Sequence, residues 1–337
     1  MVAIGYALCC QSHAPNDLVR CARLAEEAGF TFAFLADHLH PWSEEQENAP
    51  FLWSIIGGIA QVTQRLRLST ALTCPAKYAH PAMLAQAAAT AAAMMPGRFT
   101  LGLGVAEHLG EHLLGPSWPF PAVQPEVLEE TVQVIRLLWR GGVQNHWGRY
   151  YSIENLCVYT PSAEPPGILI AGNGLRVAEI AGRRGDGFIG STPDTKLVQR
   201  FEAAGGKGKP RYGKVTVCWT ANAAEARRAA HRWWLSTALR TLSIELSLPA
   251  YFVKAIARVS EDDLARAMVC SADASQHIAA IKKFAAAGYD HICVHQVGPD
   301  QEGFIRFYQR EVLPALQTRR PHDDQRRARR RSFRKSS

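Results

Sequence analysis

The sequence gathers reactive side chains most densely at residues 37–42, which read Asp-His-Leu-His-Pro-Trp directly after a short apolar run. The imidazole of His38 can exchange a proton near neutral pH, and the indole of Trp42 offers a flat face and an N–H group to a planar ligand. Asp37 is placed to orient either the ligand or the histidine. A turn capped by these polar residues is the alternative interpretation. The pattern favours proton transfer beside a flat bound molecule.

A carboxylate follows another apolar run. Residues 102–107 read Gly-Leu-Gly-Val-Ala-Glu, so small residues would let a ligand approach the backbone, and Glu107 would stand at the rim. The segment is not a dinucleotide-binding fingerprint, because a helix with a third glycine does not follow at once. An ordinary surface position for Glu107 stays open. We treat Glu107 as a candidate acid.

A third candidate segment, Ala171-Gly172-Asn173-Gly174, leads directly into a helical pattern that begins near residue 175. Free backbone N–H groups at the start of a helix bind anions. The segment therefore predicts a phosphate site at Gly172, Asn173 and Gly174, although a simple glycine-containing turn would have the same sequence.

The other polar candidates carry less information. The eight cysteines form no C-x-x-C pair and no zinc-type spacing with histidine, so we interpret them as reduced thiols and expect no metal. His295 and Trp219 lie in or at the end of apolar runs, and we interpret both as packed wall residues.

The elements that must position these residues alternate in a regular way. Short apolar runs typical of buried parallel strands are separated by helical patterns, as in Ile4–Leu8 followed by Pro15–Ala28. The predicted strands are Ile4–Leu8, Phe32–Ala36, Leu66–Leu72, Phe99–Gly104, Ile168–Ala171, Asp186–Ile189, Val215–Trp219 and Ile292–Gln296. Strands connected by right-handed helical crossovers close into a (β/α)8 TIM barrel, in which reactive groups lie at the C-terminal ends of the strands.

Two segments do not fit this alternation. Residues 145–159 have the aromatic and β-branched composition of a hairpin, which we expect to be an insertion. A helical stretch at about residues 235–266 is also additional, and we expect it to cover one mouth of the barrel.

The positive charge is concentrated at the C-terminus. The chain has a formal charge of +8, of which residues 318–337 contribute +7, so the body is close to neutral. We therefore expect a barrel domain over residues 1–318, a solvated and disordered basic tail over 319–337, and no nucleic-acid groove on the barrel. No long apolar segment is present, so we expect no membrane association and a cytoplasmic protein.

Three segments together resemble a known family. Residues 37–42 with Ala49-Pro50-Phe51, residues 104–107 and residues 182–188 (Gly-Arg-Arg-Gly-Asp-Gly-Phe) are similar to the deazaflavin-dependent dehydrogenases of the luciferase-like superfamily, especially the glucose-6-phosphate dehydrogenase branch. The resemblance runs from Ile4 to about Leu316. It implies coenzyme F-420 as the cofactor, with flavin mononucleotide (FMN) as the alternative, and a homodimer.

The resemblance also implies roles for individual residues. His38 matches the proposed base that takes the alcohol proton, Trp42 the tryptophan that stabilises the reacting complex, and Glu107 the proposed proton donor to the ring. The implied cofactor contacts are Asp37, Ala71, Leu72, Val105, Ala106, Gly172, Asn173 and Gly174, and the Ala71–Leu72 peptide bond matches a cis bond of the family.

The sequence departs from this branch where the branch binds the sugar phosphate. Of its three phosphate-binding cations, only an arginine has a counterpart, at Arg266; Gly190–Asp194 and Leu242–Leu246 lack the two lysines. Each missing contact is worth about 1.5–3 kcal/mol. We therefore expect hydride transfer between F-420 and a less charged alcohol or carbonyl compound. The alternatives are an FMN-dependent monooxygenase and a barrel that binds the cofactor without turnover.

Overall fold

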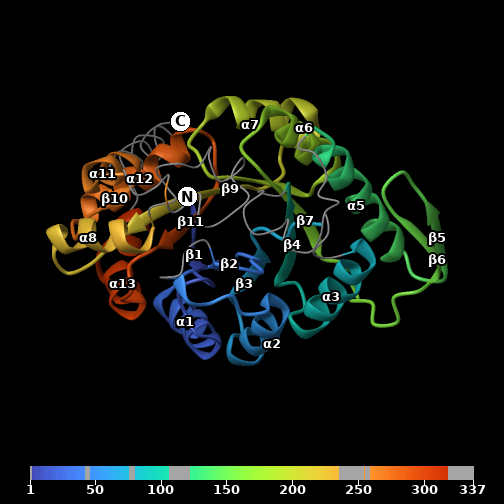
Figure 1. Cartoon of the computed structure of the whole chain (residues 1–337), viewed down its shortest axis with the longest axis horizontal. Helices are drawn as coiled ribbons and strands as arrows, with labels where there is room; N and C mark the ends of the chain where they lie inside the picture. The colour runs from blue at the N-terminus through green and yellow to red at the C-terminus, as the bar shows by residue number, and fades with distance from the viewer. Residues whose placement is uncertain are drawn as a thin grey trace, which may run out of the picture.

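The structure is a computed structural model that describes residues 2–41, 46–75, 80–105, 122–234, 254 and 259–317. Its central strands are β1 (Ala3–Leu8), β2 (Phe32–Leu35), β3 (Arg67–Thr70), β4 (Phe99–Gly104), β7 (Gly167–Ala171), β8 (Gly187–Gly190), β9 (Arg211–Cys218) and β11 (His291–Gln296). They pair in parallel in this order, and β11 pairs with β1, so the sheet closes into a barrel (Figure 1). The predicted (β/α)8 fold is confirmed.

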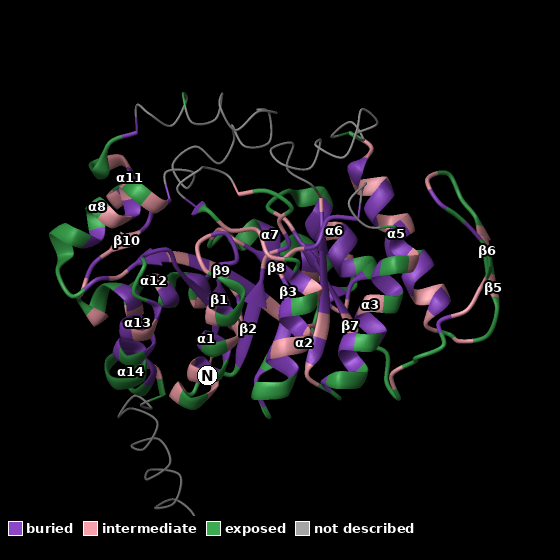
Figure 2. Cartoon of the chain, turned by 60° about the horizontal axis from the view of Figure 1, so that its bottom comes forward, coloured by how far each residue is buried: buried purple, intermediate pink, exposed green. Residues whose placement is uncertain are grey.

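Burial on both faces explains why these strands read as continuous apolar runs. Side chains that point inward form one cluster, which includes Phe32, Phe34, Leu169 and Tyr212. Side chains that point outward pack under the surrounding helices, whose outer faces are exposed (Figure 2). Parallel strands in such a barrel have no solvent-facing side, and so no polar alternation.

The helices that surround the barrel are α1 (Pro15–Ala28), α2 (Leu52–Val62), α3 (Pro81–Met94), α5 (Gln124–Leu138), α6 (Leu175–Arg184), α7 (Thr195–Phe201), α12 (Ala274–Ala286), α13 (Gln301–Phe307) and α14 (Leu313–Gln317). Helix α1 buries a stripe at helical spacing that includes Leu18, Ala22 and Ala25, and it ends at Gly29, whose φ of 99° is left-handed. Helix α1 spans the residues that the sequence predicts.

Most predicted strands differ from the observed ones by one or two residues at an end, and two elements differ by more. Strand β9 begins at Arg211, four residues before the predicted start at Val215. The sequence has a helical pattern at residues 196–204, but the α-helix ends at Phe201 and continues as a π-helical segment, η3 (Glu202–Gly206), in which Gly205 has a φ of 100°. A second π-helical segment, η5 (Tyr308–Val312), lies between α13 and α14.

The insertion predicted at residues 145–159 is a two-stranded antiparallel hairpin, β5 (Gln144–Trp147) and β6 (Ser152–Leu156), which projects beside α5 (Figure 1). The Glu130 carboxylate on α5 accepts hydrogen bonds from the backbone N–H groups of Tyr150 and Tyr151 at 3.1 and 2.9 Å. The hairpin is therefore attached to the helix layer, and the Tyr151 hydroxyl also donates to the Pro75 carbonyl after β3 at 2.9 Å.

Additional elements gather near the C-terminal end of β9. They are α8 (Ala223–Trp233), α11 (Glu261–Ala267) and the two-residue strand β10 (Val269–Cys270), which pairs with β9. Most of the helical stretch predicted at residues 235–266, and the whole predicted tail, lie outside the described residues. Among the helices that the structure describes, none is long and apolar enough to cross a membrane.

Candidate active site

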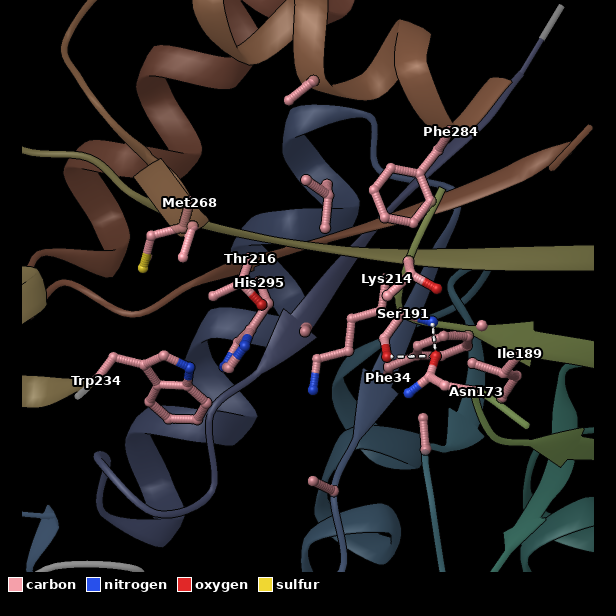
Figure 3. Close-up of a pocket in the computed structure, with 18 of the residues that line it drawn as sticks. Phe34, Asn173, Ile189, Ser191, Lys214, Thr216, Trp234, Met268, Phe284 and His295 are labelled. Carbon is pink, nitrogen blue, oxygen red and sulfur yellow. Dashed lines mark hydrogen bonds between the residues drawn. The ribbon is translucent and has the colours of Figure 1, made fainter. Parts of the chain in front are cut away.

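A cavity of about 630 Å³ opens at the C-terminal ends of the barrel strands (Figure 3). Its walls come from the ends of the barrel strands and from the additional elements α8, α11 and β10, with α12 on one side. The volume lies within the range of small-molecule and cofactor sites, and the position is the one at which TIM-barrel enzymes place their reactive groups.

Asp37 and His38 reach this cavity from the end of β2. Asp37 is buried, with 7% of its surface exposed, and its carboxylate accepts a hydrogen bond from the Thr73 hydroxyl at 2.9 Å. The Asp37 N–H donates to the Leu72 carbonyl at 3.3 Å. The residues that follow β2 and β3 are therefore fixed to each other.

The segment after β3 forms the wall beside Asp37. The Ala71–Leu72 peptide bond is cis, as the resemblance implies, and both residues line the cavity. The Ala71 N–H donates to the Leu35 carbonyl at 2.6 Å, and the Thr73 N–H donates to the Gly102 carbonyl at 2.9 Å. Backbone bonds to two neighbouring strands thus hold this segment in place.

The predicted phosphate segment joins two neighbouring loops. Gly172 and Asn173 line the cavity, whereas Gly174 lies beside it as the N-cap of α6. The Asn173 side-chain carbonyl accepts hydrogen bonds from both the backbone N–H and the hydroxyl of Ser191, each at 2.9 Å (Figure 3). The loops after β7 and β8 are therefore tied together at the cavity mouth.

The electrostatic environment keeps His38 neutral. Burial among protein atoms, and to a smaller extent the ammonium group of Lys214, lower the pKa of this imidazole from 6.5 to about 4. A neutral imidazole can accept a proton at pH 7. The residue that the sequence singles out as a base is therefore in the protonation state that a base needs.

Sequence reasoning missed Lys214. It belongs to β9 and lines the cavity, but the strand predicted from sequence begins one residue after it. A lysine at an inward-facing position of an apolar strand is the signal that could have found it. Trp234 and His295 also line the cavity, with ring centroids 4.6 Å apart, so His295 is part of the cavity wall.

Some of the remaining predicted site residues line the cavity, and others are not described by the structure. Val105 lines the cavity, and Arg266 does so from α11, where its guanidinium forms an ion pair with Asp263. Trp42, Ala106 and Glu107 lie outside the described residues, so their roles stay predictions.

All eight cysteines are free thiols, as predicted. The described part of the chain contains no group of three or more His, Cys, Asp or Glu side chains that could hold a metal ion.

Comparison with known proteins agrees with this geometry. Residues 5–291 match the sequence model of the luciferase-like monooxygenase family. The chain belongs to that family. It is 31% identical over 334 residues to an F-420-dependent glucose-6-phosphate dehydrogenase of Microbacterium testaceum (strain StLB037), with 94% of this chain and 97% of that protein covered.

Solved structures that share the fold include F-420-dependent enzymes and monooxygenases. An F-420-dependent secondary alcohol dehydrogenase in complex with an F-420–acetone adduct superposes with a TM-score of 0.86 and 26% identity, over 94% of this chain and 99% of that one. A monooxygenase of Streptomyces bottropensis has a TM-score of 0.72 and 20% identity, over 93% of this chain and 99% of that one, a likeness of fold alone.

Proposed function

We propose that this protein is an F-420-dependent oxidoreductase that transfers a hydride between the deazaflavin and an alcohol or carbonyl substrate. The observation that carries the proposal is a neutral His38 in the same cavity as the Ala71–Leu72 cis peptide and the Gly172–Asn173 loop. Relatives named for F-420 cover nearly the whole chain, which supports the cofactor.

The residues present fit such a cofactor. Ala7, Phe34, Leu72 and Ile189 give the cavity apolar walls that suit a flat ring. The start of α6, beside Gly172 and Asn173, suits a phosphate group, because the first N–H groups of a helix have no partner within the helix. The bound coenzyme supplies the hydride acceptor or donor.

The protein contributes positioning and proton transfer. In the direction of alcohol oxidation, His38 takes the proton of the substrate hydroxyl while the adjacent carbon gives up its hydride. Asp37, held by Thr73, and the Ala71–Leu72 segment orient the ring. Trp42 and Glu107 are proposed to stabilise the reacting complex and to donate a proton to the ring.

We propose an uncharged or weakly charged substrate rather than glucose 6-phosphate. The segment Gly190–Asp194, where the resemblance implies the first phosphate-binding lysine, contains no lysine, and the Asp194 carboxylate caps α7 by accepting a hydrogen bond from the Lys196 N–H at 2.8 Å. Arg266 is already paired with Asp263. An acid and a paired arginine are poor ligands for a phosphate dianion.

Fluorescence titration with coenzyme F-420, beside an identical titration with FMN, tests this function. We expect micromolar or tighter binding of F-420 and weaker binding of FMN. Preference for FMN, with oxygen uptake by the reduced flavin complex, would favour the monooxygenase instead. Binding without turnover across an alcohol and carbonyl screen would favour the non-catalytic barrel.

Assembly and location belong to the same proposal. We propose a homodimer in the cytoplasm, by analogy with the family and because all eight cysteines are free thiols. Light scattering coupled to size-exclusion chromatography measures the mass, and a monomer at micromolar concentration would contradict the dimer.

A further inference from the structure

Lys214 projects into the barrel and not toward the helix layer. Alternate residues of a strand point to opposite faces, and Tyr212, two residues earlier, belongs to the cluster inside the barrel. Lys214 and Thr216 continue that face and line the cavity. Strand β9 therefore places the cationic side chain of Lys214 inside the cavity.

The ammonium group lies between the two sides of the cavity. Figure 3 shows the Lys214 side chain between Asn173 and Ser191 on one side and His295 and Trp234 on the other. The first pair belongs to the proposed cofactor-binding loops. Lys214 thus stands where the cofactor and the substrate would meet.

Titratable groups of the neighbouring elements face the same space. They are Cys9 at the end of β1, Asp37 and His38 after β2, and His295 on β11; Cys293, also on β11, belongs to the cluster inside the barrel and does not line the cavity. The positive charge of Lys214 lowers the pKa of His38 and opposes the effect of burial on both thiols. The charge of Lys214 therefore affects titratable groups on β1, after β2 and on β11.

More basic than acidic side chains line the cavity. Among the described lining residues, Lys214, Arg227, Arg266 and Lys283 are basic and Asp37 is the one acid. Arg227 and Arg266 form ion pairs with Asp262 and Asp263, which lie outside the lining. A partly desolvated cation inside a protein interacts favourably with a negative charge brought by a ligand.

We propose that Lys214 binds an anionic group of the ligands at the reacting end of this cavity. The inference rests on the proposed function and deepens it. Two sources share this chemistry: the deazaflavin ring, whose phenolic hydroxyl can ionise, and a substrate with a carboxylate next to its hydroxyl. Neutralisation of Lys214 by such a group would also let His38 accept a proton more readily.

The first arm of the test examines the cofactor. F-420 is bound to the wild type, Lys214→Met, Lys214→Arg and Lys282→Met, and the visible absorbance of the bound ring is followed from pH 5 to 8. Lys282 is an exposed residue of α12 outside the cavity lining, so Lys282→Met controls for net charge. If the ring is the anion, Lys214→Met raises the apparent pKa of the bound ring by about one unit or more, whereas Lys214→Arg and Lys282→Met leave it near the wild-type value.

The second arm examines the substrate. Binding of lactate and of propan-2-ol, which lacks the carboxylate, is measured by the fluorescence of the F-420 complexes of the same variants. If the substrate carries the anion, Lys214→Met weakens lactate binding about tenfold or more and leaves propan-2-ol binding unchanged. Circular dichroism of each variant verifies that it is folded.

The outcomes separate this inference from the proposed function. A response in either arm supports Lys214 and identifies the source of the charge. If all variants bind F-420 alike, with the same ring ionisation and no loss of lactate binding, the Lys214 proposal is wrong and the cofactor proposal stands. If the folded wild type binds no F-420, the proposed function fails and the inference falls with it.

Discussion

His38 combines two properties that a catalytic base needs, namely a place in the cavity wall and a neutral imidazole at pH 7. Its replacement removes the acceptor for the substrate proton but leaves the Asp37–Thr73 contact and the loop at Asn173 in place. We therefore expect His38→Ala to lower kcat about 10²–10⁴-fold and to change the Kd for F-420 by less than about threefold.

Steady-state kinetics with propan-2-ol, or with the alcohol found by screening, checks this expectation. The matched control is His40→Ala, because His40 is exposed and its ring nitrogen contacts the Pro41 carbonyl at 2.7 Å. Turnover by His38→Ala at the wild-type rate would show that another group takes the proton.

Thr73 is a positioning residue, since its hydroxyl donates to the Asp37 carboxylate. Loss of one hydrogen bond to a buried carboxylate is worth about 1.5 kcal/mol, so Thr73→Val should weaken F-420 binding about tenfold. Thr73→Ser keeps the hydroxyl and should restore binding to within about threefold. Fluorescence titration measures both, and equal affinities for the two variants would show that this bond does not orient Asp37 for the cofactor.

The residues of the candidate site were predictable where the signal is local. Some site residues come directly after apolar runs, namely Asp37, His38, Gly172 and Asn173. The strand pattern alone therefore predicts that they lie at the ends of strands. Lys214 was not predictable in this way, because its neighbours Gly213 and Val215 mark the strand without fixing which face points inward. That choice is made by the pairing of β9 with β8 and β11.

Strands β3 and β4 approach each other closely at Gly102. A Cβ atom at this position would lie 1.9 Å from the Thr70 carbonyl oxygen, just before the cis peptide. Because backbone would have to move, we expect Gly102→Ala to destabilise the protein by about 3 kcal/mol and to weaken F-420 binding. Gly174→Ala is the matched control for stability, since a Cβ there meets nothing within 4 Å and φ is −101°.

Urea unfolding of the two variants measures this difference. If Gly102→Ala were as stable as Gly174→Ala, the approach of β3 and β4 would not be a constraint on this residue.

Element type was more predictable than element bounds. The helical pattern at Pro15–Ala28 predicted the bounds of α1, which ends at Gly29. Strand β10 has two residues, too few for any periodic signal, and it forms because β9 continues past β8 and offers a free edge. The π-helical continuation of α7 depends on local packing that no sequence period encodes.

Across the whole molecule, acid should destabilise the fold. Burial lowers the pKa of His13, His38, His80 and His277 below 6.5. Below pH 6.5 the unfolded chain therefore binds more protons at these sites than the folded protein does, so the free energy of unfolding decreases as the pH falls; for His38 this continues to about pH 4. Urea unfolding at pH 7.5 and pH 5 measures this, and His38→Gln should reduce the pH dependence; equal slopes for both proteins would contradict the neutral state of His38.

The distribution of charge over the whole chain predicts that the C-terminal nineteen residues are dispensable for the site. Removal of residues 319–337 takes away +7 of the +8 formal charge. We expect the shortened protein to elute much earlier from a cation exchanger, while its Tm stays within about 2 °C and its F-420 affinity is unchanged. A lower Tm would place part of the folding domain beyond residue 318.

The two sides of the cavity are held by separate sets of contacts. On the proposed cofactor side, Asn173 ties its loop to Ser191, and Thr73 ties its segment to Asp37. The wall formed by α11 and β10 is attached to β9 through the short pairing of β10. Protein engineers could therefore diversify residues 265–270 to change which alcohols are accepted, and select for new substrates without rebuilding cofactor recognition.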